Sequence, residues 1–167
     1  MQQEERRFYY KAGELAGNGF ELEVTPEIAG WTHSSLRILN LEPGGEHSFD
    51  SGDEEMVVLP LSGSCVVDCD GESRQLKGRD DVFSAVTDFV YIPIGSAVTV
   101  RSDTGGRFAI PGALATTRYP FGYQAAEDVS VELRGAGNSS RQVVNFCTPG
   151  DVCCRIGDGS PCAREGT

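Results

Sequence analysis

From Phe20 onward the chain alternates short apolar segments with turn-forming residues, a pattern typical of β-strands joined by tight turns. "FELEV" alternates apolar and polar positions and ends at Thr25-Pro26. "SLRILNL" alternates in the same way and is followed by Pro43-Gly44-Gly45. Because a period of two places the apolar side chains on one face of a strand, both segments are predicted to be strands with one buried face.

The central part of the chain predicts further strands and turns. "EMVVLPLSG" is a continuous apolar run that we expect to end in a Ser-Gly turn. Pro60 within it indicates an edge strand or a bulge, because proline cannot donate a ladder hydrogen bond. "SCVVDCDGE" predicts a strand that ends in a hairpin at Asp70-Gly71. Asp80 to Val100 predicts one strand, a turn at Pro93-Ile94-Gly95, and a second strand.

The remaining segments complete an all-β pattern without a sustained helical period. "RFAIPGALAT", "VSVELRG" and "RQVVNF" are predicted to be strands, and many short strands at this spacing indicate a sandwich or a barrel. Residues 1–149 are predicted to form this unit. Residues 150–167 are rich in glycine and cysteine and hold few bulky aliphatic side chains, so they are predicted to form a disordered or loosely attached tail.

Charge and cysteine placement narrow the functional classes. The 167 residues carry a formal net charge of −11, which argues against nucleic-acid binding because phosphate backbones are repelled. The start "MQQEERRFYYKAG" lacks the apolar core of a secretory signal, and no apolar run is long enough to cross a membrane, so a cytoplasmic location is expected. The six cysteines are unevenly placed, and in a cytosolic chain they do not predict a disulfide framework.

Two glycine-containing stretches resemble the frame of the metal site in cupin barrels. Those barrels place His-x-His and a glutamate after a glycine-rich turn, and a last histidine three residues beyond Pro-x-Gly. This chain keeps Gly44-Gly45, Gly63 and Pro93-Ile94-Gly95, so the predicted fold is an all-β, cupin-like barrel. However, "SFDSG" stands where His-x-His would fall, and Val98 takes the place of the last histidine.

Few candidate metal ligands remain in the chain. His47 lies near the first cluster, and Glu55 could supply one carboxylate, but one imidazole and one carboxylate make a poor metal site. We therefore expect no metal ion or other cofactor in this chain, and no residue is assigned a catalytic role. The plainer interpretation makes His47 a solvated turn residue and makes Glu54 and Glu55 a solvated strand start.

Two other groups of residues are also predicted to be structural. His33 is interpreted as a packing neighbour of Trp31 rather than as a base. Cys65 and Cys69 are four residues apart in a predicted strand, so they point to the same face, where buried thiols usually serve packing. The cysteines of the last segment match no zinc-binding spacing.

Several longer motifs give a more specific resemblance. "VTPEIAGW", "EEMVVLPLSGSCVV", "GRDDVF", "YIPIG" and "RGAGNSSRQV" together resemble the amino-terminal lobe of the bacterial 5-deoxyglucuronate isomerases, a two-cupin family. The resemblance covers residues 20–149. It implies an aldose–ketose isomerisation of 5-deoxy-D-glucuronate to 2-deoxy-5-keto-D-gluconate in myo-inositol breakdown. It also implies a small sugar acid as substrate and a homo-oligomer among the expected assemblies, and the lack of a long apolar run predicts no membrane partner.

The same resemblance implies that the divalent metal belongs to a second lobe, which follows the "RGAGNSSRQV" strand. Val98 is then expected in a lobe kept for packing and assembly. This chain continues for only seventeen residues after Gly150, so no family metal ligand can be carried over, and a reading-frame error at the gene end is one hypothesis. We expect the chain to be inactive alone. The alternatives are a lobe that binds a sugar acid without turnover and a lobe that serves assembly only.

Overall fold

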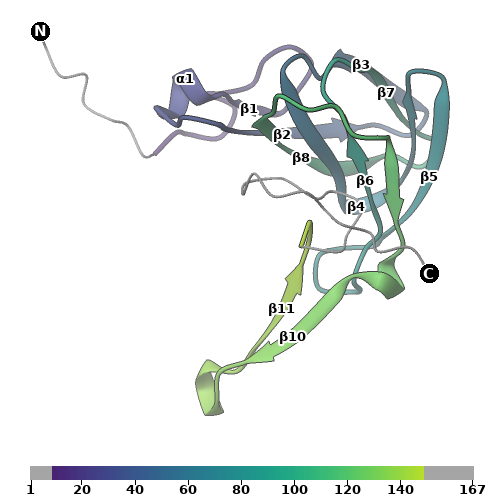
Figure 1. Ribbon diagram of the computed structural model, residues 1–167. Helices are drawn as coiled ribbons and strands as arrows, with labels where there is room; N and C mark the ends of the chain where they lie inside the picture. The colour runs from purple at the N-terminus through teal and green to yellow at the C-terminus, as the bar shows by residue number, and fades with distance from the viewer. Residues whose placement is uncertain (1–8, 149–167) are drawn as a thin grey trace, which may run out of the picture.

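The computed structural model describes residues 9–148, and the predicted tail at 150–167 lies outside this range. The described chain is mostly β-structure, wound into one curved sheet of nine strands with a separate two-stranded sheet beside it (Figure 1). The strands of the large sheet are β1 (Leu22–Val24), β2 (Ser34–Leu41), β3 (Gly45–Asp50), β4 (Glu54–Cys69), β5 (Glu72–Arg79), β6 (Phe89–Ile92), β7 (Ala97–Ser102), β8 (Gly106–Leu114) and β9 (Gly122–Gln124). The all-β, cupin-like prediction is confirmed.

Helical structure within the described residues is limited to three short turns. α1 (Pro26–Ala29) begins after Thr25, whose hydroxyl accepts a hydrogen bond from the Ile28 backbone N–H, and ends at Gly30 with a φ of 66°. Proline at the first helical position costs no hydrogen bond there, so the predicted turn at Thr25-Pro26 becomes a helix start. The 3₁₀ turns η1 (Ala126–Asp128) and η2 (Gly137–Ser139) lie later in the chain.

Strand β4 organises the sheet, because its two halves have different neighbours. The first half lies between β8 and β6, and the second half lies between β7 and β5. The β4–β8 ladder shifts register between Pro60 and Ser62, so the predicted bulge is confirmed. The predicted turn at Ser62-Gly63 is wrong. The chain runs on through these residues as one strand, because the bulge bends β4 without reversing it.

The bulge also changes which side chains of β4 face the core. Before it, Met56 and Val58 point into the main apolar cluster; after it, Cys65, Val67 and Cys69 do so. The inward positions therefore switch from even to odd residue numbers. One inserted residue has this effect because side chains alternate between the two faces of a strand.

The two predicted turns, at Asp70-Gly71 and at Pro93-Ile94-Gly95, lie near each other, because Arg118 donates hydrogen bonds to both the Asp70 carboxylate and the Ile94 carbonyl. Asp70 and Gly71 have φ values of 50° and 90° and join β4 to β5, which confirms the predicted hairpin. Within Asp80 to Val100 only residues 89–92 form the first strand, and the second is β7. The two strands do not pair with each other; β6 pairs with β4 and β9, and β7 pairs with β3 and β4.

The segment before β6 is fixed by a buried carboxylate. Asp88 is 1% exposed and accepts hydrogen bonds from the backbone N–H groups of Lys77 and Gly78 at 2.8 and 3.0 Å. The hydroxyl of Tyr123 donates a third hydrogen bond at 3.0 Å. Asp88 thereby ties β5 and β9 to the start of β6. This compensation explains how a carboxylate can be buried in the sheet.

The apolar side chains form two clusters on opposite faces of the sheet. The main cluster fills the space that the curved sheet encloses, and its buried members come from Phe20 and from the six strands β2, β4, β5, β6, β7 and β8. The second cluster lies on the outer face of β4 and β6, around Val57, Phe89 and Tyr91. Tyr119, Val144 and Phe146 cover it from the later part of the chain.

The segments "VSVELRG" and "RQVVNF" form a hairpin apart from the barrel. β10 (Ser130–Arg134) and β11 (Arg141–Asn145) pair only with each other among the described strands. Figure 1 shows this hairpin extending away from the curved sheet, with η2 at its tip. All residues of β10 are exposed. Both segments are strands as predicted, but neither adds to the barrel.

Candidate functional site

The enclosed space of the barrel is filled by apolar side chains. Val98 is 1% exposed, and Cys65 and Cys69 are each 2% exposed in the same cluster. Val98 lies directly opposite Cys69 in the β4–β7 ladder and opposite Phe49 in the β3–β7 ladder. The prediction that the two thiols share one buried face is confirmed. Val98 occupies the interior with a branched aliphatic side chain.

The two interior thiols are kept neutral by their surroundings. Burial raises the pKa of the Cys65 thiol to about 12, and the nearby charge of Asp88 acts in the same direction. Burial also raises the pKa of Cys69. Thiolates are the nucleophiles and metal ligands of cysteine chemistry, so these thiols are poorly suited to either role.

Glu55 lies on the other face of β4. It is 1% exposed, and the hydroxyl of Tyr91 donates a hydrogen bond to its carboxylate at 2.8 Å. Burial and the neighbouring Glu55 carboxylate raise the pKa of Tyr91. Because Val57 belongs to the outer cluster and side chains alternate, Glu55 points away from the barrel interior. The expectation of a solvated strand start is wrong here, since Tyr91 and the outer cluster cover this carboxylate.

Glu54, its neighbour, is also buried and enters an ion-pair network. Arg37 contacts the Glu54 carboxylate at 2.8 Å and the Glu23 carboxylate at 3.1 Å, and it donates to the Ser35 hydroxyl at 3.2 Å. Glu54 is 8% exposed, so the prediction that it is solvated is wrong as well. The cause is Arg37, which projects from β2 and compensates the buried charge.

His47 is a half-buried strand residue rather than a solvated turn residue. It lies in β3, and its ring centroid is 4.7 Å from that of Phe20 and 6.2 Å from that of Phe49. Its buried Nε2 has no hydrogen-bond partner among the described residues. A Cβ at Gly19 would meet the imidazole ring at 2.4 Å, which shows how closely the chain covers it. The solvated-turn prediction is corrected because β3 begins at Gly45 and turns this side chain inward.

His33 and Trp31 are placed differently from the sequence-based interpretation. His33 is exposed, and 49% of the Trp31 surface is accessible. The backbone carbonyl of His33 accepts a hydrogen bond from the Leu114 N–H at 2.8 Å. His33 is therefore tied to the fold by its main chain, and its predicted packing role is wrong because the loop before β2 runs along the surface.

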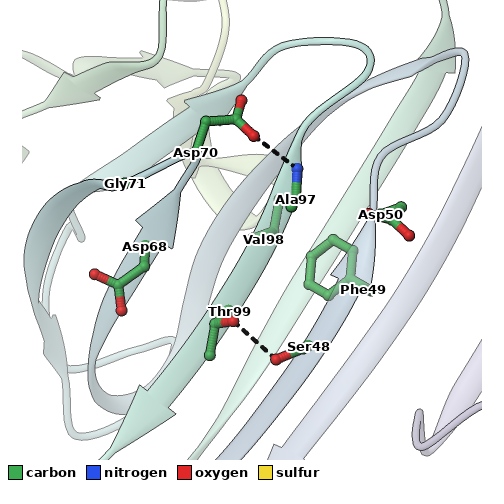
Figure 2. Close-up of a pocket in the computed structure, with 9 residues that line it drawn as sticks. All are labelled: Ser48, Phe49, Asp50, Asp68, Asp70, Gly71, Ala97, Val98 and Thr99. Carbon is green, nitrogen blue, oxygen red and sulfur yellow. Dashed lines mark hydrogen bonds between the residues drawn. The ribbon is translucent and has the colours of Figure 1, made fainter.

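A shallow acidic depression lies on the outer face of β3, β7 and the end of β4. Its volume is about 340 Å³, and Figure 2 shows the residues that line it: Ser48, Phe49, Asp50, Asp68, Asp70, Gly71, Ala97, Val98 and Thr99. The Ser48 and Thr99 hydroxyls are 2.8 Å apart, and the Ala97 N–H donates to Asp70 at 2.9 Å. The depression carries carboxylates from three residues. The sequence did not indicate it, because these residues come from three separate strands.

The carboxylates of the depression are largely engaged by neighbouring groups. The Ala97 N–H and then Arg118 lower the pKa of Asp70, and Arg118 contacts this carboxylate at 2.7 Å. Asp68 accepts hydrogen bonds from Ser73 and Arg101. The remaining field is negative, which suits neutral hydroxyl groups or cations better than an anionic sugar acid.

The donors of the described residues do not form a metal centre. Within residues 9–148 no group of three or more His, Cys, Asp and Glu side chains is arranged to hold a metal ion. Glu55 and His47, the two candidate ligands, lie on different faces of the sheet, since His47 contacts Phe20 of the interior cluster. The residues present therefore do not fit the metal site of a cupin.

Two other sequence-based expectations concern cysteines and membranes. Cys147 is disulfide-bonded, whereas Cys65 and Cys69 are free thiols. The sequence did not predict a disulfide framework, and the bond at Cys147 departs from that expectation. Among the described residues, no helix has the length and apolar character needed to cross a bilayer.

The curved all-β sheet, its Pro-x-Gly turn and its filled interior define a barrel of the cupin class. A family model described as the KduI/IolB family matches residues 8–156, and the chain belongs to that family. An IolB-like protein from Salmonella typhimurium LT2 has a similar fold, with a TM-score of 0.73 at 23% identity over 78% of this chain and 50% of that one.

Curated relatives carry a common name. The chain is 31% identical over 130 residues to the 5-deoxy-glucuronate isomerase of Geobacillus kaustophilus, covering 77% of this chain and 47% of that protein. It is 29% identical over 142 residues to the enzyme of the same name from Geobacillus thermodenitrificans, covering 84% and 52%. The chain therefore spans about half the length of the curated relatives it matches.

Proposed function

We propose that the protein serves the 5-deoxy-glucuronate isomerase function of its family, and that residues 9–148 form a non-catalytic lobe within that function. The reaction would convert 5-deoxy-D-glucuronate, an aldose acid, to 2-deoxy-5-keto-D-gluconate, a ketose acid, during inositol breakdown. Such a shift needs a base that removes the proton beside the carbonyl and a group that stabilises the enediolate. A soluble sugar-acid substrate of this kind would place the protein in the cytoplasm.

The observation that carries this proposal is the filled interior of the barrel. Val98, Cys65 and Cys69 meet in the interior with Leu39, Phe108 and the other apolar members of the main cluster. A substrate would need open space and polar groups that converge on it, as small-molecule sites usually provide. The interior offers apolar side chains and neutral thiols instead. The packed interior would make this lobe a stable scaffold. Catalysis would then depend on residues outside this lobe.

The proposed role needs no metal step within the described residues. The donors that a cupin metal would need are replaced by Val98 and "SFDSG", and Glu55 is committed to Tyr91 on the outer face. We therefore assign no residue of this lobe to metal binding. A divalent metal, if the family reaction uses one, would be held elsewhere.

A sugar-acid-binding lobe without turnover is the alternative function, and the charge of the depression argues against it. Asp50, Asp68 and Asp70 line this depression, so the carboxylate of a uronate would meet negative charge. An assembly role agrees better with the exposed hairpin of β10 and β11. Isothermal titration with the sugar acid separates the two alternatives, because only the binding lobe would give saturable heat.

The experiment that tests the proposal is an isomerase assay on the purified chain. Conversion of 5-deoxyglucuronate would be followed with added divalent metals, and the Geobacillus kaustophilus isomerase would serve as the positive control. We expect no turnover above the metal-only reaction, because the lobe holds no converging catalytic groups. A rate within a few fold of the control enzyme would overturn the assignment of a non-catalytic lobe.

A further inference from the structure

The turn that precedes β1 holds the only Asn-Gly pair of the sequence. Asn18 and Gly19 are exposed and have φ values of 52° and 84°, which is typical of the tight two-residue turns that this pair favours. Gly17 and Phe20 close the turn with two backbone hydrogen bonds, at 3.2 and 2.8 Å. The N–H of Gly19 takes part in neither bond. Local opening of this surface turn therefore breaks few hydrogen bonds.

The side chain of Asn18 is the outer end of the ion-pair network of Arg37. Its amide nitrogen donates a hydrogen bond to Oε2 of Glu23 at 2.6 Å, and Oε1 of the same carboxylate accepts one from Arg37 at 3.1 Å. Arg37 also contacts the buried carboxylate of Glu54 at 2.8 Å. Asn18 is therefore a neutral donor to a carboxylate that is already engaged by an arginine.

We propose that Asn18 is a site of spontaneous deamidation, in which its side-chain amide becomes a carboxylate. The backbone nitrogen of Gly19 attacks the side-chain carbonyl carbon of Asn18, and the new C–N bond closes a five-membered succinimide. The amide nitrogen of Asn18 leaves as ammonia and takes up the proton lost by Gly19. Water then opens the ring at either carbonyl, which gives aspartate or isoaspartate. This modification goes beyond the proposed isomerase function and does not depend on it.

The residue that follows each asparagine distinguishes Asn18 from the other three asparagines of the chain. Asn40 and Asn145 precede leucine and phenylalanine, whose side chains crowd the attacking nitrogen. Gly19 has no side chain, so its nitrogen can approach the neighbouring carbonyl carbon closely. Asn138 precedes a serine in the exposed turn η2 and is the natural comparison, because it shares the exposure of Asn18 but lacks the glycine.

The new carboxylate would disturb the ion-pair network. An amide nitrogen donates hydrogen bonds, whereas an ionised carboxylate only accepts them. Two carboxylates would then stand where Asn18 and Glu23 now lie 2.6 Å apart, and like charges at such a distance repel. Because Arg37 holds Glu23 in place, the turn is the part that must move.

The isoaspartate product would also change the main chain of the turn. It adds one backbone carbon between Gly17 and Phe20, so the two hydrogen bonds of this tight turn would lose their register. Gly19 lies so close to the imidazole of His47 that a Cβ there would meet the ring at 2.4 Å. Phe20, the next residue, is 5% exposed in the main apolar cluster. Modification is therefore expected to loosen the cover of His47.

Peptide mapping by mass spectrometry tests the site in the unmodified chain. The protein would be incubated at mildly alkaline pH, because the attacking nitrogen must lose its proton, and the conversion of each asparagine would be followed with time. We expect Asn18 to convert at least several-fold faster than Asn138 and to give both aspartate and isoaspartate. Conversion of Asn138 at the same rate or faster would overturn the assignment.

Urea unfolding of Asn18→Asp, which imitates one product, tests the consequence. This variant should unfold at a lower urea concentration than the wild type, whereas the matched control Asn138→Asp should unfold at the wild-type concentration. The same Asn18→Asp change in a Glu23→Gln background should cost less than it does in the wild type, because the repelling carboxylate is gone. Equal midpoints for the two Asp variants, or an unchanged loss in the Glu23→Gln background, would overturn the proposed link to the network.

Discussion

At the level of single side chains, His47 shows how a residue near glycines can still pack against the core. The preceding Gly44 and Gly45 predict a turn at His47, but β3 starts at Gly45 and carries its imidazole inward. The sequence holds a weak signal for this placement, since Phe49 two residues later would share the same face of a strand. The contact with Phe20 requires the fold and could not be read from spacing.

His47→Ala is predicted to lower the free energy of unfolding by about 1–2 kcal/mol, because the ring packs against Phe20 and Phe49. This replaces the smaller effect expected of a solvated residue. The measurement is urea unfolding of the two proteins. His33→Ala is the control, since His33 is exposed, and it should change stability by no more than about 0.5 kcal/mol. Equal effects of the two substitutions would contradict the half-buried, packed placement of His47.

Alkaline pH is predicted to destabilise the fold through its protonated interior groups. The pKa of Cys65 rises from 9.0 to about 12 and that of Tyr123 from 10.0 to about 12. Above the lower values the unfolded chain loses protons that the folded chain keeps, so unfolding becomes more favourable. This contribution to stability is complete below about pH 9 and is lost as the pH rises toward about 12.

Unfolding free energies measured from pH 7 to 11 check this prediction. Cys65→Val keeps an apolar side chain in the interior and removes the thiol, so it should flatten the part of the decline that begins near pH 9. If the wild type and this variant lost stability in parallel throughout, the decline would have another origin.

At the level of elements, alternation predicted the strands well, because most strands of the large sheet have one face in an apolar cluster. The Asp70-Gly71 hairpin was also predictable, since both residues adopt positive φ in a turn that favours these residue types. The length of β4, which runs from Glu54 to Cys69, could not be predicted from the sequence. Its bulge depends on close approach of Gly63 to Gly106, which come from separate segments. The outward direction of Glu55 could not be predicted either, because the bulge decides which positions of β4 face the interior.

Gly78→Ala is predicted to destabilise the protein by several kcal/mol, roughly the upper range for single substitutions. A Cβ at Gly78 would lie 1.8 Å from the Gly63 carbonyl oxygen, so β4 and β5 would have to separate. Gly71→Ala is the matched control, because Gly71 also has positive φ but has open space around it. Backbone strain alone should cost it about 1 kcal/mol. Denaturant melts of both variants give the difference, and similar losses would refute the steric account.

At the level of the whole molecule, the frame of glycine and proline residues together with the longer motifs was enough to predict the fold and the family. The separation of the β10–β11 hairpin from the barrel was not predictable, because "VSVELRG" and "RQVVNF" alternate like any half-buried strands. Pattern alone does not tell which face has a partner. The acidic depression was missed for a related reason, since strand register decides which carboxylates gather.

The central claim about the whole molecule is that apolar packing has replaced ligand binding in this barrel. Val98, Cys65 and Cys69 take the space that converging ligands would need. The test needs a metal ion that would bind an imidazole and carboxylate site. The ion should also bind weakly to cysteine thiolates, because Cys65 and Cys69 lie in the interior. Mn²⁺ meets that requirement, because soft thiolates select other metals.

The most direct measurement is the Mn²⁺ content of the purified chain after loading and desalting, determined by elemental mass spectrometry. The Geobacillus kaustophilus isomerase, treated in parallel, is the reference for its family. We predict that the chain retains far less than one Mn²⁺ ion, on the order of one per ten chains or fewer, because its interior offers no ligand set. Retention of about one Mn²⁺ per chain that is lost on Glu55→Gln or His47→Ala would contradict the account.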